Sequence, residues 1–425
     1  MMSERLLEAA RFSFKGLLEP GDRVVCGQVC AEPLTLTQQL VADCGELRQP
    51  VEIFLGALFS RTFDATSSAM RFLSYGAIGR SGMLADRGVL DILPERYSRL
   101  ADLFASGALR ADVVLLQVAH GDGDQLSLGL ASDYVIDAAR KARVVVVEVN
   151  PDVPWTHGSP LPENIRVDHW VRAAYPPLQL EPPIMDAVSQ KIAMHVASLV
   201  PDGATLQVGV GALPDATLNA LQDHRGIGLH SGVLGDACRR LIASGAIDNS
   251  RKGVDAGISV TNTVCGSTET FRFVHRNPAV EVRHSRLTHG AQLLAKVQRL
   301  HAINGALEVD LSGQVNCEQL QGRQLGGLGG LLDFARAARE GEGGRGITVL
   351  PATAAGGAYS RIVAKLGGPA TIGRSDADTV VTEYGVAHLR NASLAERAQR
   401  LIAIAAPEFR DGLLSQLREL QGGAR

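Results

Sequence analysis

The segment Pro201–Asp236 reads PDGATLQVGVGALPDATLNALQDHRGIGLHSGVLGD, and its first half has the pattern of a strand, a glycine-rich turn and a helix. The β-branched and apolar residues of Thr205–Val210 predict the strand. Gly209 and Gly211 allow a tight turn and a close approach of the backbone to a ligand. Pro214 opens the predicted helix, because proline is tolerated in a first helical turn. Backbone N–H groups at such a helix start favour a phosphate or a developing oxyanion.

This glycine pattern alone leaves its role open. Gly-x-Gly-x-x-Pro departs from the dinucleotide-binding fingerprint, which has Gly or Ala where Pro214 stands. The pattern is equally consistent with a structural turn that binds no ligand. A nucleotide site would also need an acidic residue at the end of the next strand. Asp236 lies near the required distance, but HSGVLGDACRRL does not resemble a strand end, so this hypothesis ranks low.

The composition indicates a globular α/β protein. A chain of 425 residues is long for one core, which predicts two domains. Hydrophobic residues make up 45% and charged residues 20%, which is ordinary for a soluble enzyme. Only 4% of residues are aromatic while 46 are glycine, which favours twisted sheets with small-residue turns. The net charge of −3 gives no reason to expect a nucleic-acid partner.

Neither a membrane span nor an export signal is evident. No segment reaches the roughly 18 apolar residues of a transmembrane helix. The start, MMSERLLEAARFSFKG, has no apolar core of a signal peptide, so we expect a cytoplasmic protein without a membrane partner. The six cysteines form no Cys-x-x-Cys pair, so we expect reduced, mostly buried thiols and no metal site.

A proline-rich segment, PPLQLEPP (Pro176–Pro183), predicts the domain boundary, because it fits neither a helix interior nor a central strand. We therefore expect one domain over 1–183 and a second over 184–425. After the linker, Asp186 can cap a helix with an apolar face at Val188, Ile192, Val196 and Leu199.

The two sides of this linker resemble each other. LLEPGDRVVCGQVCAEPLTLTQQLV in the first half and LVPDGATLQVGVGALPDATLNALQ in the second share the order apolar, Pro–Gly, strand, Gly, Pro, helix. Gly21 matches Gly203 and Gly27 matches Gly209, at an offset of roughly 180 residues, which is the size of a domain. We therefore expect two similar, pseudo-duplicated open α/β domains with mostly parallel sheets, and a ligand in the cleft between them.

Apolar runs typical of buried parallel strands occur in both halves, with helical stretches such as Asp133–Ala142 between them. The runs are Val51–Leu58, Asp112–Val118, Arg143–Asn150, Thr205–Val210, Gly346–Leu350 and Thr379–Thr382.

Phrases along nearly the whole chain resemble the acetyl-CoA hydrolase/transferase family, which includes 4-hydroxybutyrate, butyrate and acetate CoA-transferases. Several ordered motifs at compatible spacing are more specific than any one of them. They are VVVVEVNPDVPWTHG (Val144–Gly158), LQVGVGALPDATLNAL followed by GLHSGVLGD, INGALEVDLSGQVNCE (Ile303–Glu318), GGLGGLLDFARAA (Gly326–Ala338), ITVLPATAAGGAYSRIV (Ile347–Val363) and VVTEYGVAHLR (Val380–Arg390).

The resemblance implies two α/β domains with the active site between them. Family members move CoA between carboxylic acids: a glutamate attacks the thioester to form an anhydride, and CoA then returns to give a glutamyl-CoA thioester. The resemblance also implies short-chain acyl-CoA and a carboxylic acid as substrates, no permanently bound cofactor, and a homodimer or larger homo-oligomer. The residues expected to line CoA and the thioester are Gly209, Gly211, Pro214, Gly326, Gly327, Gly329 and Gly330.

The sequence departs from the family where chemistry is expected. The family pattern His-Ser/Thr-Glu-Met is here His230-Ser231-Gly232-Val233, so Gly232 occupies the position of the nucleophilic glutamate. Glycine has no side chain and cannot form the anhydride. A further departure is at His289, in a segment where the family usually carries an asparagine near the acyl group.

Three interpretations follow. In the first, water replaces the glutamate and the protein is a hydrolase, with Glu383 or His289 as the base if either lies within hydrogen-bond reach. In the second, Asp236 replaces the nucleophile, although its offset along the chain is awkward. In the third, the protein binds acyl-CoA without turnover. For Glu383 a structural salt bridge, and for the glycines after Leu325 a merely flexible loop, are the simpler alternatives.

Overall fold

The structure is a computed structural model that describes residues 5–45, 50–65, 67–122 and 125–422. The chain forms two compact units. Unit 1 consists of Met1–Glu181, Val233–Asp236 and Val260–Gly290, and unit 2 of Pro182–Gly232, Ala237–Ser259 and Ala291–Arg425. The first segment of unit 1 thus ends inside the proline-rich linker, and two later segments also belong to unit 1. The division at 183/184 stays a prediction about domains.

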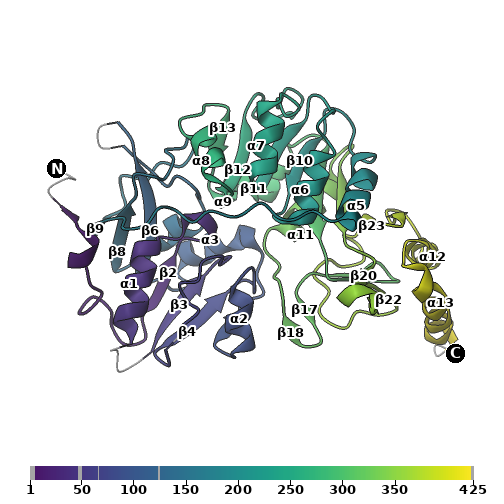
Figure 1. Cartoon of the computed structure of the whole chain (residues 1–425), viewed down its shortest axis with the longest axis horizontal. Coiled ribbons are helices and arrows are strands. Elements are labelled where there is room, and N and C mark those ends of the chain that lie inside the picture. Colours follow the sequence, from purple (N-terminus) through teal and green to yellow (C-terminus); the bar gives the residue numbers. More distant parts are fainter. Residues whose placement is uncertain (1–4, 46–49, 66, 123–124, 423–425) are drawn as a thin grey trace. The chain divides into compact units, whose positions relative to one another are not determined.

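The first sheet has the strand order β1-β9-β8-β6-β2-β3-β4-β5, with β7 paired to β6 (Figure 1). Neighbouring strands along this order run parallel, and only the β6–β7 pair is antiparallel. The bounds are β1 Leu6–Leu7, β2 Arg23–Cys26, β3 Val51–Leu55, β4 Met70–Ser74, β5 Leu90–Ile92, β6 Val113–His120, β7 Leu126–Ser127, β8 Val144–Val149 and β9 His169–Arg172.

The second sheet has the order β13-β12-β11-β10-β14-β19-β23-β24. Strands β11, β10, β14, β19 and β23 run parallel, and β24 returns antiparallel to β23. The bounds are β10 Thr205–Val208, β11 Gly228–Leu234, β12 Ser259–Val264, β13 Val280–Val282, β14 Leu300–Gly305, β19 Arg345–Val349, β23 Thr379–Thr382 and β24 Gly385–His388. Short additional strands are β15 Glu308–Asp310, β16 Val315–Asn316, β17 Gln319–Leu320, β18 Arg323–Gln324, β20 Thr353–Ala354, β21 Tyr359–Ser360 and β22 Ile362–Val363.

The strand order of the second sheet repeats that of the first. Reading β5-β4-β3-β2-β6-β8-β9 against β13-β12-β11-β10-β14-β19-β23 matches strands in the same sequence order. The prediction of two similar, mostly parallel α/β sheets is therefore confirmed.

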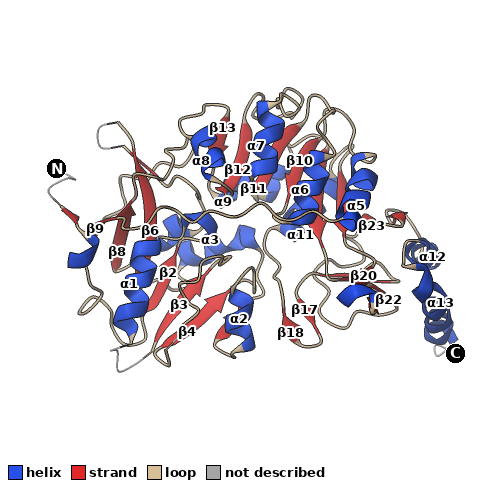
Figure 2. Ribbon diagram, viewed as in Figure 1, coloured by secondary structure: helices blue, strands red, loops and turns tan. Residues whose placement is uncertain are grey.

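Helices flank the strands (Figure 2). Their bounds are α1 Leu34–Cys44, α2 Ser81–Asp86, α3 Tyr97–Ser106, α4 Val135–Ala139, α5 Ala187–Ala197, α6 Ala212–Asn219, α7 Asp236–Ala243, α8 Thr268–Val274, α9 Ser285–Thr288, α10 Ala291–Leu294, α11 Leu331–Glu340, α12 Leu394–Ala403 and α13 Pro407–Gly422. Alternate residues of β2 point to opposite faces of the first sheet: Val24 packs in one core with Leu36 of α1, and Val25 in another with Phe104 of α3. Burial on both faces explains why these strands are continuous apolar runs.

Several local predictions can be compared with these bounds. The predicted strands are present, with ends shifted by up to three residues, and Asp186 caps α5 by accepting a hydrogen bond from Ser189 N at 2.7 Å. The helix predicted to open at Pro214 begins two residues earlier, at Ala212. The interpretation that HSGVLGD is not a strand end was wrong, because β11 runs to Leu234 beside β10 and Asp236 follows it.

Within the described residues, no helix combines the length and apolarity needed to cross a membrane. The same residues hold no cluster of three or more His, Cys, Asp or Glu suited to a metal ion. Cys26, Cys30, Cys44, Cys238 and Cys265 are buried and Cys317 is half-buried, which confirms mostly buried thiols. Burial raises the pKa of Cys30 to about 12, so this thiol stays protonated and unreactive.

A buried carboxylate supplies the N-terminal cap of α1. The residue preceding the helix, Pro33, makes no side-chain cap. Instead Glu148, at the end of β8, accepts hydrogen bonds from Thr35 N at 2.8 Å and Leu36 N at 3.2 Å. These bonds favour the charged carboxylate, but burial has the larger effect and raises the pKa of Glu148 to about 7.

Because the folded chain holds the Glu148 proton more tightly than the unfolded chain, stability falls as pH rises from 4.5, the usual pKa, to about 7. Glu148→Gln should remove this dependence, which is worth on the order of 2–3 kcal/mol. We expect the melting temperature of the parent chain to drop more between pH 5 and pH 8 than that of the variant. Scanning calorimetry at both pH values tests this, with the exposed Glu419→Gln as control. Equal drops in parent and Glu148→Gln would contradict it.

Candidate functional site

The carboxyl edge of the second sheet is the candidate site. Parallel strands end at one common edge, and here the chain direction across the sheet changes at β10: β11 pairs on one side of it and β14 on the other. Open parallel sheets bind ligands at such a point, outside the carboxyl ends of the strands. The segments that follow β10 and β14 are therefore the first place to look for substrate contacts.

The Gly209–Gly211 turn connects β10 to α6 at this edge. Gly211 is the N-cap residue of α6 and has φ +126°, a conformation that residues with a side chain rarely adopt. It provides no side chain to cap the helix, so the first N–H groups of α6 face the edge. Gly209 differs, since a Cβ there would meet only Pro214 Cγ at 3.9 Å. The backbone thus requires glycine at 211, whereas glycine at 209 has no such requirement.

A pair of amide side chains joins the ends of β10 and β14. Gln207 Nε2 donates to Asn304 Oδ1 at 3.1 Å, and Asn304 Nδ2 donates to Gln207 Oε1 at 2.9 Å. Both residues are buried, so each amide needs these partners. Sequence reasoning missed this pair; two amide residues near the ends of adjacent strands were the available signal.

Gly232 lies beside the Gly209 turn. It is half-buried in β11 and follows the buried Ser231. Ser231 Oγ accepts from Val208 N at 3.2 Å and donates to Val208 O at 3.1 Å, which aligns the two strands at this level. The position that resembles the family's glutamate is therefore at the carboxyl edge, and it carries no side chain.

The glycines of Gly326–Gly330 lead into α11 and are all half-buried. Only the short segment Gly341–Gly344 joins α11 to β19, and α11 packs on β14 and β19, so the helix start lies at the carboxyl edge. Gly330 is its N-cap residue and Gly329 has φ +50°. A Cβ on Gly326 would lie 2.2 Å from Cys317 O, so at least this glycine is required by packing.

Glu383 follows β23 at the same edge. Its Oε2 accepts a hydrogen bond from Ala352 N, just beyond β19, at 2.8 Å. Its charge also acts on Arg361, whose pKa is lowered chiefly by burial while Glu308 and Glu383 oppose that effect. Strands β10, β14 and β19 separate β23 from β11. At about 4.8 Å per strand, the positions of Glu383 and Gly232 are roughly 19 Å apart along the edge.

His289 belongs to unit 1 and is described there. It follows α9, is 4% exposed, and its Nδ1 lies 2.7 Å from Thr288 Oγ1. Its ring packs against Tyr97 with centroids 4.7 Å apart. The Tyr97 hydroxyl accepts from Gln28 Nε2 at 2.8 Å and donates to Asn262 Oδ1 at 2.7 Å. The histidine thus sits on a buried polar network.

Asp236, the alternative nucleophile, caps α8. Its carboxylate accepts hydrogen bonds from Ser267 Oγ at 2.6 Å, from Ser267 N at 3.2 Å and from Thr270 Oγ1. These groups are the start of α8, where a carboxylate satisfies donors that have no intrahelical partner. The structure therefore provides a structural role for this side chain.

Comparison with known proteins gives consistent matches. Residues 266–417 match the model of the acetyl-CoA hydrolase/transferase C-terminal domain. The chain is 34% identical over 422 residues to a 4-hydroxybutyrate coenzyme A transferase of Clostridium kluyveri, covering 98% of both. RipA from Yersinia pestis has a TM-score of 0.91 at 29% identity, covering 99% of this chain and 98% of that one. A 4-hydroxybutyrate CoA-transferase structure from Porphyromonas gingivalis has a TM-score of 0.79 at 30% identity, covering 98% of both.

The two glycines of the β10–α6 turn should respond differently to a methyl group. Gly211→Ala should destabilise the chain by about 1–3 kcal/mol, because alanine at φ +126° is strained. Gly209→Ala serves as the matched control and should cost clearly less, since its Cβ would make only an ordinary contact. Thermal unfolding followed by circular dichroism measures both. Equal losses in the two variants would contradict the assigned backbone roles.

Proposed function

Because the chain belongs to the acetyl-CoA hydrolase/transferase family, we propose that it cleaves short-chain acyl-CoA thioesters with water instead of a protein carboxylate. The family resemblance read from the motifs is confirmed by the matched domain and by relatives that span the whole chain. Gly232 is the observation that carries the proposal. A residue without a side chain cannot form the acyl–glutamyl anhydride through which the family transfers CoA.

The proposed step is hydrolysis of the thioester. The water oxygen attacks the carbonyl carbon, the carbon–sulfur bond breaks, and CoA leaves as a thiolate that takes up a proton. The products are the free carboxylic acid and CoA. Negative charge develops on the carbonyl oxygen, and backbone N–H groups at the starts of α6 and α11 are suitable donors for it. Glycines in Gly209–Gly211 and Gly326–Gly330 permit the close approach that this requires.

Glu383 is the proposed base. Its anchored Oε2 holds the carboxylate at the edge beside the start of β19, where it can accept a proton from water. The spacing of roughly 19 Å along the edge argues against a direct bond to a water at Gly232 and favours an extended substrate that crosses several strands. Acyl-CoA is such a substrate. His289 is the less favoured base, because its ring is buried against Tyr97 in unit 1.

Two alternatives have different support. Transfer through Asp236 is disfavoured, because its carboxylate already caps α8. A protein that binds acyl-CoA without turnover is the second candidate, and the same missing side chain at Gly232 favours it. The two candidates differ in a measurable product, since only the enzyme releases CoA.

A thiol-release assay separates these functions. The chain is offered acetyl-, propionyl-, butyryl- and 4-hydroxybutyryl-CoA, each with and without acetate. We expect CoA release that does not depend on acetate, and a decrease of roughly 10²–10⁴-fold in Glu383→Gln. Glu340→Gln, an exposed carboxylate on α11, is the matched control and should retain activity. New acyl-CoA formed only with acetate would overturn hydrolysis, and no release despite calorimetric binding would support the non-catalytic candidate.

Restoring the carboxylate tests whether the rest of the site is intact. Gly232→Glu should gain, or raise, acetate-dependent CoA transfer, because it returns a nucleophile to the family position. Gly232→Gln, which has the same size without the charge, should not. Transfer is measured by chromatography of the acyl-CoA products. A folded Gly232→Glu chain that binds CoA but transfers none would count against a preserved site.

Other expectations from the sequence stay predictions. They are the cytoplasmic location, the homo-oligomeric state, the short acyl chain, and an active site between the domains. A carboxylic acid as product or acceptor follows from the proposed chemistry. The family's chemistry uses CoA thioesters as substrates and gives no reason to expect a permanently bound cofactor.

A further inference from the structure

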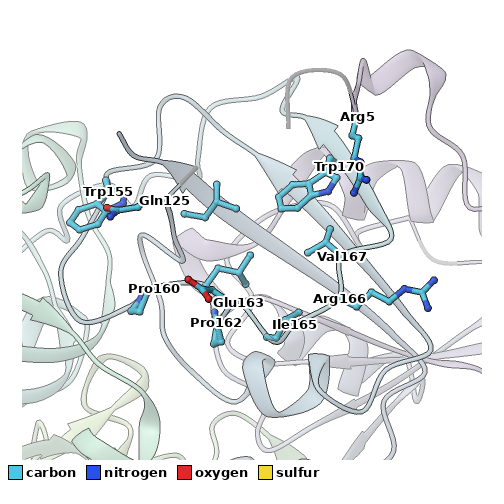
Figure 3. A pocket seen from close by; sticks show the side chains of 12 residues that line it. Arg5, Gln125, Trp155, Pro160, Pro162, Glu163, Ile165, Arg166, Val167 and Trp170 are labelled. Carbon is cyan, nitrogen blue, oxygen red and sulfur yellow. The ribbon is translucent and has the colours of Figure 1, made fainter. Parts of the chain in front are cut away.

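A groove in unit 1 contains both tryptophans of a chain that has only two. Trp155 and Trp170 line it together with Leu126, Val167, Arg5 and Arg166, and its volume is about 1060 Å³ (Figure 3). We call it the tryptophan groove. In a chain with 4% aromatic residues, two half-buried indoles in one groove are unusual. None of the residues discussed above as candidate site residues lines it.

The edge of the first sheet builds one end of the groove. Trp170 is in β9, and its Cα partner on the outermost strand β1 is Leu6, so Arg5 lies next to this pair. The segment between β8 and β9 contributes Trp155, Arg166 and Val167, and β7 contributes Leu126. Figure 3 shows Trp155 with Gln125 at one end of the groove, and Trp170 with Arg5 toward the other.

The lining combines flat apolar surfaces with positive charge. Indole rings and aliphatic side chains favour a planar apolar group. Two arginines line the groove against one acidic residue, Glu163. The Arg166 side chain is 90% exposed and pairs with Asp168 at 2.9 Å, which is a weak surface ion pair that an incoming anion can replace. Indoles also attract cations, but the two arginines oppose that.

We propose that the tryptophan groove binds a flat organic anion, an aromatic ring system carrying one carboxylate or sulfonate. The apolar rings would contact the indoles and Leu126, and the acidic group would lie near Arg5 and Arg166. The volume is of the size that small organic ligands occupy. This site is independent of the proposed hydrolysis, so either conclusion can fail without the other.

Intrinsic fluorescence tests the proposal directly, because both tryptophans report on the groove. The probe is 1-anilinonaphthalene-8-sulfonate, a flat aromatic sulfonate. Added to the full chain, it should quench tryptophan emission in a saturable way, with one molecule bound per chain. Trp170→Leu should weaken binding, measured by the emission of the probe itself, by about tenfold or more. Quenching that does not saturate would overturn the proposal.

Charge specificity is tested with matched variants. The double substitution Arg5→Gln and Arg166→Gln should weaken sulfonate binding roughly fivefold at low salt, and should leave the neutral analogue N-phenyl-1-naphthylamine unaffected. Arg99→Gln, another exposed arginine paired with a nearby aspartate, is the control and should change neither.

Val167→Glu gives a second variant in case Trp170→Leu does not fold, as judged by circular dichroism. Its negative charge at the groove should repel the sulfonate and not the neutral analogue. Unchanged sulfonate affinity in folded Val167→Glu, or equal affinity of the parent chain for the two probes, would overturn the assignment to an anion.

Discussion

The parallel pairing of β10 with β11 on one side and β14 on the other is the constraint on which the candidate site depends. Thr205 is opposite Gly228 on one neighbour and Leu300 on the other. A slip of one residue would exchange the two faces of a strand, which burial on both sides does not permit without new cavities. The register therefore brings the Gly209 turn, Gly232 and Asn304 to one edge. The Gln207–Asn304 amide pair reinforces it where the strands end.

The two sheets share one topology but use the corresponding point differently. In the first sheet, Gln28 follows β2, and its amide bonds to Tyr97 and Asp133 through Nε2, and to Tyr75 and Ala57 through Oε1. Gly56 makes room for it, since a Cβ there would lie 2.1 Å from Gln28 Oε1. Such a fully bonded buried network is rigid and excludes water. In the second sheet the same point presents glycine backbone, which leaves N–H groups for a substrate.

Burial also sets the ionisation of the acids in the first sheet. It raises the pKa of Asp133 to about 6 and that of Glu148 to about 7. Both accept backbone N–H groups at helix starts, Asp133 at Val135 and Glu148 at Thr35. These acids act as caps supplied by the tertiary fold. They make the stability of unit 1 sensitive to pH near neutrality without any part in the proposed chemistry.

Much of the fold could be predicted from residues alone. Period-free apolar runs predicted strands such as Thr379–Thr382, and Asp186 announced the start of α5, because both depend on local patterns. The strand β11 was missed. Glycine and polar residues in GLHSGVL are poor strand formers, and only pairing with β10 and burial make the segment a strand.

The sequence by itself determined the kind of residue available at each position: glycine where the family has its glutamate, glycine turns before two helices, and a carboxylate at Glu383. Only the tertiary structure decided which of them share an edge. Strand order separates Glu383 from Gly232 by three strands, assigns His289 to a buried contact with Tyr97, and uses Asp236 as a cap for α8. The physical reason is that side-chain chemistry is local, whereas distance across a sheet follows from strand order, which burial and register determine over the whole chain.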